Sequence, residues 1–233
     1  MNPEQEYKLS TIGYVSSPYK EKFAVPRQAQ LAPSVKGQVH LVGDFDIAET
    51  ISEIENYSHL WLLFLFNHNL EKGWKPKVRP PRLGGNKRVG VFASRSPFRP
   101  NGIGMSIVKL EKIDCLKGHV CLHISGMDLV DATPIIDIKP YIPYSDSIPN
   151  AISGFATQSP TLLDVQFSDA VLCQLQSKKN GAYHKQAIQE ILAQDPRPAY
   201  KKSHLDNKEY GVKLFDYNVK FIVKDQQVKV LSL

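Results

Sequence analysis

The strongest constraint on the fold is a series of short segments rich in β-branched residues in the middle of the chain. They cover residues 88–95, 104–114, 119–129 and 133–143, and turn-forming residues separate them. β-Branched and aromatic residues favour strands, and glycine, proline and aspartate favour the turns between them. Many short strands with few intervening helices are typical of a β-barrel or a strongly curved sheet. The predicted fold class is therefore mainly β, or α+β, with an N-terminal β-barrel.

The N-terminal part of the chain is expected to add strands at residues 7–18, 35–42 and 59–67, the last of them buried on both faces. Residues 19–28 carry mixed charges and a proline, and they are expected to form an ordered surface loop. A helix is expected over residues 43–59, because isoleucines recur there at helical spacing after an aspartate that could cap it. The isoleucines are Ile47, Ile51 and Ile54, and the aspartate is Asp44 or Asp46.

The pattern changes beyond residues 145–160. Residues 168–179 and 183–194 show apolar faces at helical spacing and predict two helices. Residues 210–233 predict a closing hairpin with its turn near Asp225. A chain of 233 residues is long enough for two cores. We expect a barrel domain at residues 1–149 and a smaller α+β domain at residues 150–233.

Composition and cysteine usage predict a cytoplasmic protein. The longest apolar run, residues 60–66, is too short to span a bilayer, and the first ten residues do not resemble a signal peptide. The three cysteines, Cys115, Cys121 and Cys173, lack a C-x-x-C spacing. This suits a reducing compartment and argues against a disulfide framework or a structural zinc site. A membrane partner is not expected.

The positive charge is concentrated in one part of the chain. The net charge is +6, but residues 72–109 hold ten Lys or Arg and no Asp or Glu. Such a field attracts phosphates. Neither a P-loop nor a Rossmann glycine pattern is present, since Val91 and Phe92 follow Gly90 and no predicted βαβ unit surrounds Gly102 and Gly104.

Within this basic stretch, residues 95–104 have the composition of a ligand-binding loop. Pro97 and Pro100 stiffen the backbone around Arg95 and Arg99, so that less entropy is lost when an anion binds. Asn101 could bond to a base, and the glycines allow close approach of the backbone. A solvated basic turn is the alternative. Residues 195–202, with Arg197, Tyr200, Lys201 and Lys202, form a second and weaker candidate.

Polar residues near predicted strand ends give further candidates. Asn67 and His68 end the strand at residues 59–67, where a rigid strand could present them to a ligand. Asp128, Asp131 and Asp137 follow in a region expected near the core, and capping or ion pairing explains each of them about as well as function does. No matching His or Glu cluster supports a metal site.

Several of these stretches resemble the TrmO family of S-adenosylmethionine-dependent tRNA methyltransferases. The likeness is carried by "IGYVSSPYKEKFAVPRQ", "YSHLWLLFLF", "RPPRLGGNKRVGVFASRSPFRPN", "DLVDATPIIDIKPYIPY" and "LAQDPRPAYKK", in order along the chain. The resemblance implies a cofactor-binding barrel, a small C-terminal domain and a homodimer. It also implies tRNA, not DNA, as substrate, methylated on N6 of the threonylcarbamoyladenosine that follows the anticodon.

The resemblance also assigns roles to residues of this chain. The expected S-adenosylmethionine contacts are Pro26, Arg27, Gln28, Asn67, His68, Arg95, Asp128, Leu129, Val130 and Asp131. The expected catalytic positions are Tyr19, Arg99, Asn101 and Asp195. The expected contacts to tRNA, at its anticodon arm, are Lys20, Arg79, Arg82, Arg197, Tyr200 and Lys201.

Two other functions fit the same residues. A non-enzymatic RNA-binding barrel would use the basic and aromatic loops without a cofactor. A hydrolase or isomerase acting on a small anion would use the pocket without tRNA. Saturable binding of S-adenosylmethionine would argue against the first alternative, and a requirement for tRNA against the second.

Overall fold

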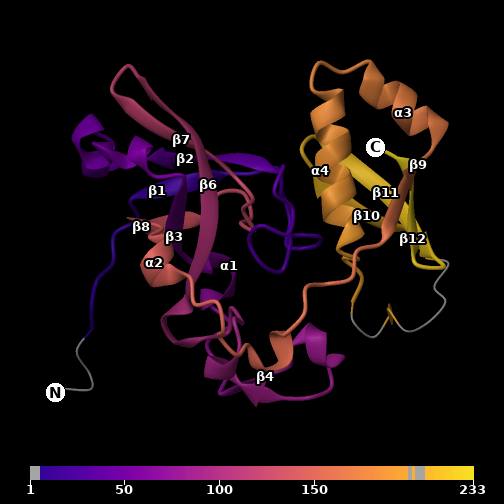
Figure 1. Cartoon of the computed structure of the whole chain (residues 1–233), viewed down its shortest axis with the longest axis horizontal. Helices are drawn as coiled ribbons and strands as arrows, with labels where there is room; N and C mark the ends of the chain where they lie inside the picture. Colours follow the sequence, from indigo (N-terminus) through magenta and orange to yellow (C-terminus); the bar gives the residue numbers. More distant parts are fainter. Residues whose placement is uncertain (1–5, 199–200, 203–207) are drawn as a thin grey trace.

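The computed structural model describes residues 6–198, 201–202 and 208–233. Within these ranges, six strands close into a barrel in the order β1-β2-β7-β6-β3-β8 (Figure 1). The strands are β1 (Gly13–Ser16), β2 (Lys36–Leu41), β3 (His59–Leu65), β6 (Ile103–Leu116), β7 (His119–Ser125) and β8 (Pro134–Pro140). Every neighbouring pair in the barrel is antiparallel. The predicted mainly β fold with an N-terminal barrel is confirmed.

Alternation of side chains explains why these segments form barrel strands. In β3, Leu60, Leu62 and Phe64 point into the core, and the residues between them are half-buried. The prediction that β3 is buried on both faces is therefore wrong, because a closed barrel has a single interior and the other face of each strand points away from it. The first strand is also shorter than predicted, since it runs only from Gly13 to Ser16.

The predicted helix over residues 43–59 is absent from the described structure, and three 3₁₀ helices replace it: η1 (Gly43–Phe45), η2 (Ala48–Ile51) and η3 (Ile54–Asn56). Glu53 has a left-handed backbone with φ 65°, which a continuous α-helix excludes. Asp46 does not cap a helix, because its carboxylate accepts hydrogen bonds from the Val120 amide and from His119 Nδ1, both at 2.6 Å. The segment is thus held to the start of β7.

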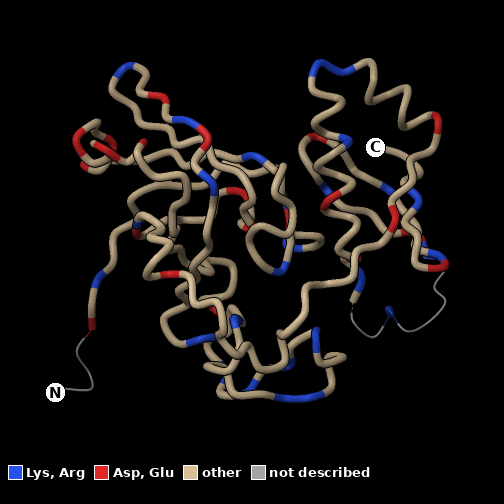
Figure 2. The backbone as a smooth tube through the Cα atoms, in the orientation of Figure 1, with Lys and Arg blue, Asp and Glu red and all other residues tan. Residues whose placement is uncertain are grey.

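The basic stretch is irregular. It contains α1 (Asn67–Leu70), β4 (Lys77–Val78), η4 (Pro81–Leu83), β5 (Val89–Gly90), η5 (Val91–Ala93) and η6 (Pro100–Gly102). The predicted strand at residues 88–95 is wrong beyond its first residues, because β5 ends at Gly90 and η5 follows directly. Figure 2 shows Lys and Arg gathered along this part of the chain, in the loops below the barrel.

After α2 (Pro143–Asp146) and η7 (Gly154–Ala156), the chain forms a second, four-stranded sheet in the order β10-β11-β12-β9. Its strands are β9 (Asp164–Phe167), β10 (Tyr210–Leu214), β11 (Tyr217–Lys224) and β12 (Gln227–Ser232). The turn between β11 and β12 falls at Asp225 and Gln226, as predicted. The two predicted helices are confirmed as α3 (Asp169–Gln176), which Ser168 caps, and α4 (Gly181–Ala193). None of the described helices is long and apolar enough to cross a membrane.

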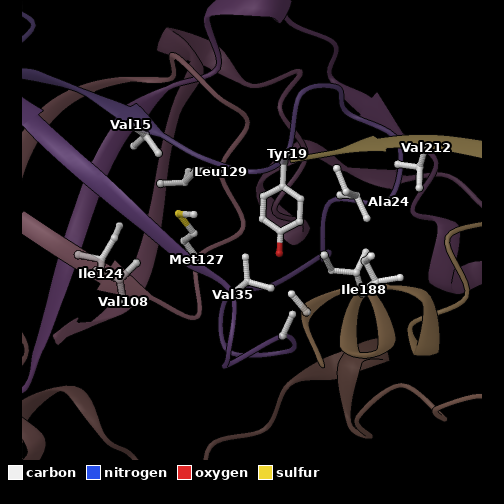
Figure 3. Close-up of a cluster of buried hydrophobic side chains, with 14 of the residues drawn as sticks. Val15, Tyr19, Ala24, Val35, Val108, Ile124, Met127, Leu129, Ile188 and Val212 are labelled. Carbon is white, nitrogen blue, oxygen red and sulfur yellow. The ribbon is translucent and has the colours of Figure 1, made fainter. Parts of the chain in front are cut away.

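The second sheet and the barrel share a packed junction. Tyr19 is fully buried there and pairs with Leu214 of β10 through an isolated bridge. The Tyr183 hydroxyl of α4 accepts from the Lys36 amide at 2.9 Å. Figure 3 shows the Tyr19 ring between Ala24, Val35 and the helix that carries Ile188. The expectation of a surface loop is therefore wrong at Tyr19, whose ring joins the two cores.

Candidate functional site

The principal candidate site is a cavity of about 580 Å³ beside one end of β3 and β6. This volume lies in the range of small-molecule and cofactor sites. Its wall is formed by Lys22 and Thr133 together with residues 25–28, 63–69, 94–95, 97, 99, 103–106 and 128–130. Four segments that are distant in sequence, within residues 22–28, 63–69, 94–106 and 128–133, thus meet at one place. Most of the cofactor contacts that the sequence predicted lie in this wall.

Asp128 is the carboxylate of the cavity. The hydroxyl of Ser106, a buried residue on β6, donates a short hydrogen bond to Asp128 Oδ1. Burial raises the pKa of Asp128 to about 6, and the Ser106 hydrogen bond and the charge of Arg95 oppose that rise. At neutral pH this side chain is mainly an anion in an apolar setting. Such a group favours a positively charged or hydrogen-bond-donating ligand.

Two arginines of residues 95–104 line the same cavity. The Arg95 guanidinium donates to the Gln28 side-chain oxygen at 2.6 Å, which links the predicted ligand-binding loop to residues 25–28. Arg99 donates to the carbonyl of Ser94 at 3.4 Å. Asn101 adopts a left-handed backbone with φ 65° and does not line the cavity. Both arginines therefore line a cavity, as the ligand-binding interpretation requires.

Helix α1 follows the end of β3 and carries the amide side chains of Asn67 and Asn69. Asn67 and His68 line the cavity, as the sequence predicted. Lys22 donates to the Asn69 side-chain oxygen at 2.6 Å and to the His68 carbonyl at 3.2 Å. Burial, followed by the nearby charge of Lys72, lowers the pKa of Lys22. Sequence reasoning missed Lys22 and the buried Asn69, because their contact joins residues far apart in the chain.

A second cavity, of about 740 Å³, adjoins the first and shares Val25, Pro26 and Arg27 with it. Its wall also includes Arg82 of the basic stretch and the loop that follows α4. In that loop Arg197 donates to Asp195 through Nε at 2.8 Å and Nη2 at 3.0 Å. Both side chains are buried. A bidentate pair of this kind is rigid and specific in geometry.

Asp195 organises the charges of this second cavity. Burial on its own would raise the pKa of Asp195, but the hydrogen bonds and charges of Arg197 and Lys202 outweigh burial and lower it. The Lys202 ammonium donates to the Asp195 carbonyl at 2.7 Å. Asp195 has a left-handed φ of 49°, which bends the chain out of α4. Of the predicted candidate at residues 195–202, Asp195, Pro196, Arg197 and Lys202 thus belong to a cavity wall and not to a simple surface turn.

Several predicted site residues lie elsewhere. Tyr19 is in the core, and its hydroxyl has no hydrogen-bond partner among the described residues. Asp131 accepts from the Ser17 amide and from Lys20, each at 2.8 Å, and it lies outside the cavity wall. Arg79 and Lys201 line neither cavity. Tyr200 lies outside the described residues. Among the described residues, no group of three or more His, Cys, Asp or Glu could hold a metal ion.

Comparison with known families accounts for both halves of the chain. The tRNA-methyltransferase O N-terminal domain matches residues 14–147, and the TrmO C-terminal domain matches residues 160–233. The chain belongs to the TrmO family. The resemblance seen in the sequence is therefore confirmed.

Relatives of known name support this assignment over the full length. The chain is 47% identical over 229 residues to the tRNA (adenine(37)-N6)-methyltransferase of Escherichia coli, covering 97% of both. It is 45% identical to a putative S-adenosylmethionine-dependent methyltransferase of Pseudomonas aeruginosa, covering 91% of both. The crystal structure of TrmO from Pseudomonas aeruginosa matches with a TM-score of 0.80 and 36% identity, covering 98% of each chain.

Proposed function

We propose that this protein transfers a methyl group from S-adenosylmethionine to N6 of adenosine 37 of tRNA, when that adenosine carries the threonylcarbamoyl group. The name of the Escherichia coli relative supports the position and the atom. The observation that carries the proposal in this chain is one cavity that holds Asp128 beside Arg95 and Arg99, at the edge of a basic stretch. A carboxylate for the cofactor and a cation for the substrate base, Arg99, thus lie together.

The cavity fits S-adenosylmethionine chemically. Its wall is largely apolar, with Leu63, Phe64 and Leu129 offering surface to a purine ring. Asp128 offers a carboxylate to an ammonium or amino group, and Gln28 and Asn67 offer amides. We infer that these groups hold the cofactor together with Pro26, His68, Arg95 and Val130, and that Asp131 supports them from outside the wall. Arg27 also lines this cavity, but its guanidinium lies near Asp195 and Arg82 of the second cavity. When bound, the cofactor supplies an electrophilic methyl group on a sulfonium.

The protein's own contribution to the reaction is orientation and charge. Methyl transfer to nitrogen is an in-line displacement, so the rate depends on how closely the chain fixes both reactants. N6 of a carbamoylated adenine is a poor nucleophile until its proton has passed to solvent. A guanidinium such as that of Arg99, held by the Ser94 carbonyl, would stabilise the resulting anion. We therefore propose Arg99 as the group that acts on the substrate nitrogen.

The tRNA is proposed to dock on the basic stretch and on residues 195–202. Lys20, Arg79, Arg82, Arg197, Tyr200 and Lys201 are the proposed contacts to the anticodon arm, and Asn101 and Asp195 are proposed to shape the loop around the reacting base. We assign Tyr19 to packing because of its burial. We further propose a cytoplasmic homodimer whose barrel domain spans residues 1–149 and whose smaller domain spans residues 150–233.

The test is methyl transfer from labelled S-adenosylmethionine to tRNA from cells with and without the threonylcarbamoyl modification. We expect label only in modified tRNA, and equal label in both preparations would refute the proposed substrate. Saturable binding near one S-adenosylmethionine per subunit would separate this function from a non-enzymatic RNA-binding barrel. Arg99→Ala should abolish turnover while Arg88→Ala, in the same basic stretch and outside both cavities, should affect only docking.

A further inference from the structure

The second cavity is cationic beyond what its own acids neutralise. Five basic side chains and two acidic ones belong to its described wall. The basic residues are Arg27, Arg82, Arg197, Lys202 and Lys224, and the acidic residues are Asp195 and Asp225. A concave surface with an excess of one charge focuses its field on the enclosed space. This cavity is therefore suited to an anionic group.

The internal contacts of the described wall leave three of these cations for a ligand, namely the Lys224 ammonium and the guanidinium groups of Arg27 and Arg82. Asp195 occupies the Arg197 guanidinium through two hydrogen bonds, and the Asp195 carbonyl holds the Lys202 ammonium. In contrast, no hydrogen bond or ion pair joins the guanidinium of Arg27 or Arg82 to any of the described residues. Burial lowers the pKa of Arg27, the charge of Asp195 raises it and the charge of Arg82 lowers it, so that both Asp195 and Arg82 lie near Arg27.

The position of Arg27 relates this cavity to the first one. Val25, Pro26 and Arg27 form a wall common to both. In a threonylcarbamoyl group, four consecutive bonds separate the adenine N6 from the carboxylate carbon. These bonds place the two atoms about 5 Å apart when the group is extended. A base that offers N6 to the first cavity could therefore extend its carboxylate past Arg27 into the second cavity.

We propose that Arg27 and Arg82 form a carboxylate-binding subsite in the second cavity, which recognises the threonyl carboxylate of the modified adenosine. This inference rests on the proposed function. Each of the two guanidinium groups can donate hydrogen bonds to a carboxylate oxygen, and the Asp195–Arg197 pair fixes the neighbouring part of the wall. The subsite makes the unmodified adenosine a poorer substrate, because that substrate lacks the anion with which Arg27 and Arg82 would pair.

The experiment compares two synthetic anticodon hairpins as methyl acceptors. One carries the threonylcarbamoyl group with its free carboxylate, and the other carries the isosteric, uncharged threonine carboxamide. With wild-type enzyme, we expect a KM at least about tenfold lower for the carboxylate hairpin, since hydrogen bonds to charged groups differ from neutral ones by that order. In Arg82→Gln, this preference should fall to about threefold or less, while the Kd for S-adenosylmethionine stays the same.

The matched control is Arg88→Gln, which removes the same charge from the same basic stretch outside both cavities. It should lower the affinity for both hairpins equally and keep the carboxylate preference. If Arg82→Gln instead weakens both hairpins equally, the cavity binds an RNA phosphate and the carboxylate assignment is overturned. Equal use of the two hairpins by wild-type enzyme also overturns it. Failure to methylate any modified tRNA would contradict the proposed function itself, which is a separate result.

Discussion

Replacing Asp128 with Asn should stabilise the folded protein at neutral pH. The pKa of this carboxyl is about 6 in the folded chain against 3.8 in the reference state. Because the folded chain binds this proton more tightly than the unfolded chain, ionisation of Asp128 lowers stability as the pH rises from about 4 to about 6. A difference of about two pH units corresponds to about 3 kcal/mol. An asparagine avoids this cost and can still accept from Ser106.

The assay is urea unfolding of wild type and Asp128→Asn at several pH values between 4 and 8. The difference in unfolding free energy should be near zero at pH 4 and should grow to as much as about 3 kcal/mol above pH 7. Taking the difference between the two proteins cancels the titration of other groups. Ser106→Ala should move the window to higher pH, because the Ser106 hydrogen bond favours the charged carboxylate.

A stability difference that stays constant with pH would refute the reasoning about Asp128. The same substitution should weaken the binding of S-adenosylmethionine, because it removes the carboxylate that we place against the cofactor. Loss of a hydrogen bond between charged groups corresponds to an increase in Kd of about tenfold to a hundredfold. A gain in stability with a loss of affinity would identify Asp128 as a binding residue held at the expense of the fold.

Three further predictions concern the core, the Asp195 pair and the docking surface. Leu62 is fully buried in the barrel, so Leu62→Ala should lower the free energy of unfolding, measured with urea, by about 2–5 kcal/mol. A loss below about 1 kcal/mol would mean that the barrel interior is loosely packed. Asp195→Asn should lower the free energy of unfolding by about 3–5 kcal/mol, because it leaves the charge of buried Arg197 uncompensated. The double variant Asp195→Asn/Arg197→Met should recover most of this loss, and no recovery would contradict the pairing. Affinity for tRNA should fall steeply between about 50 and 200 mM salt, and a flat titration would exclude the basic stretch as the docking surface.

The local elements of the fold were predictable to the extent that neighbouring residues determine them. The helices at α3 and α4, the turn at Asp225 and the strands from β6 to β8 agree with apolar period and turn composition. The expected helix over residues 43–59 was wrong although its isoleucines have helical spacing. Asp46 binds to the start of β7, more than 70 residues away, and Glu53 adopts a left-handed backbone. Helical periodicity is a weak signal where tertiary contacts compete with it.

The candidate site, like the fold, could be predicted from the sequence only in part. Sequence motifs brought forward Arg27, Gln28, Arg95 and Asp128, and all of them line the first cavity. The motifs could not show that Lys22 holds the Asn69 side chain, because no local pattern links the two positions. They also placed Tyr19 in the catalytic set, whereas its ring fills the junction between the barrel and α4.

The sequence by itself determined the alternation that closes the barrel, the amphipathic helices and the family to which the chain belongs. These properties reside in the order of residues over short windows, where propensity and side-chain period act directly. Only the tertiary structure decided which charges meet. It placed Arg27 between two cavities and brought Arg82 and Asp195 into the same wall, because the free energy of burying Tyr19 and the α4 face joins segments that the sequence keeps far apart.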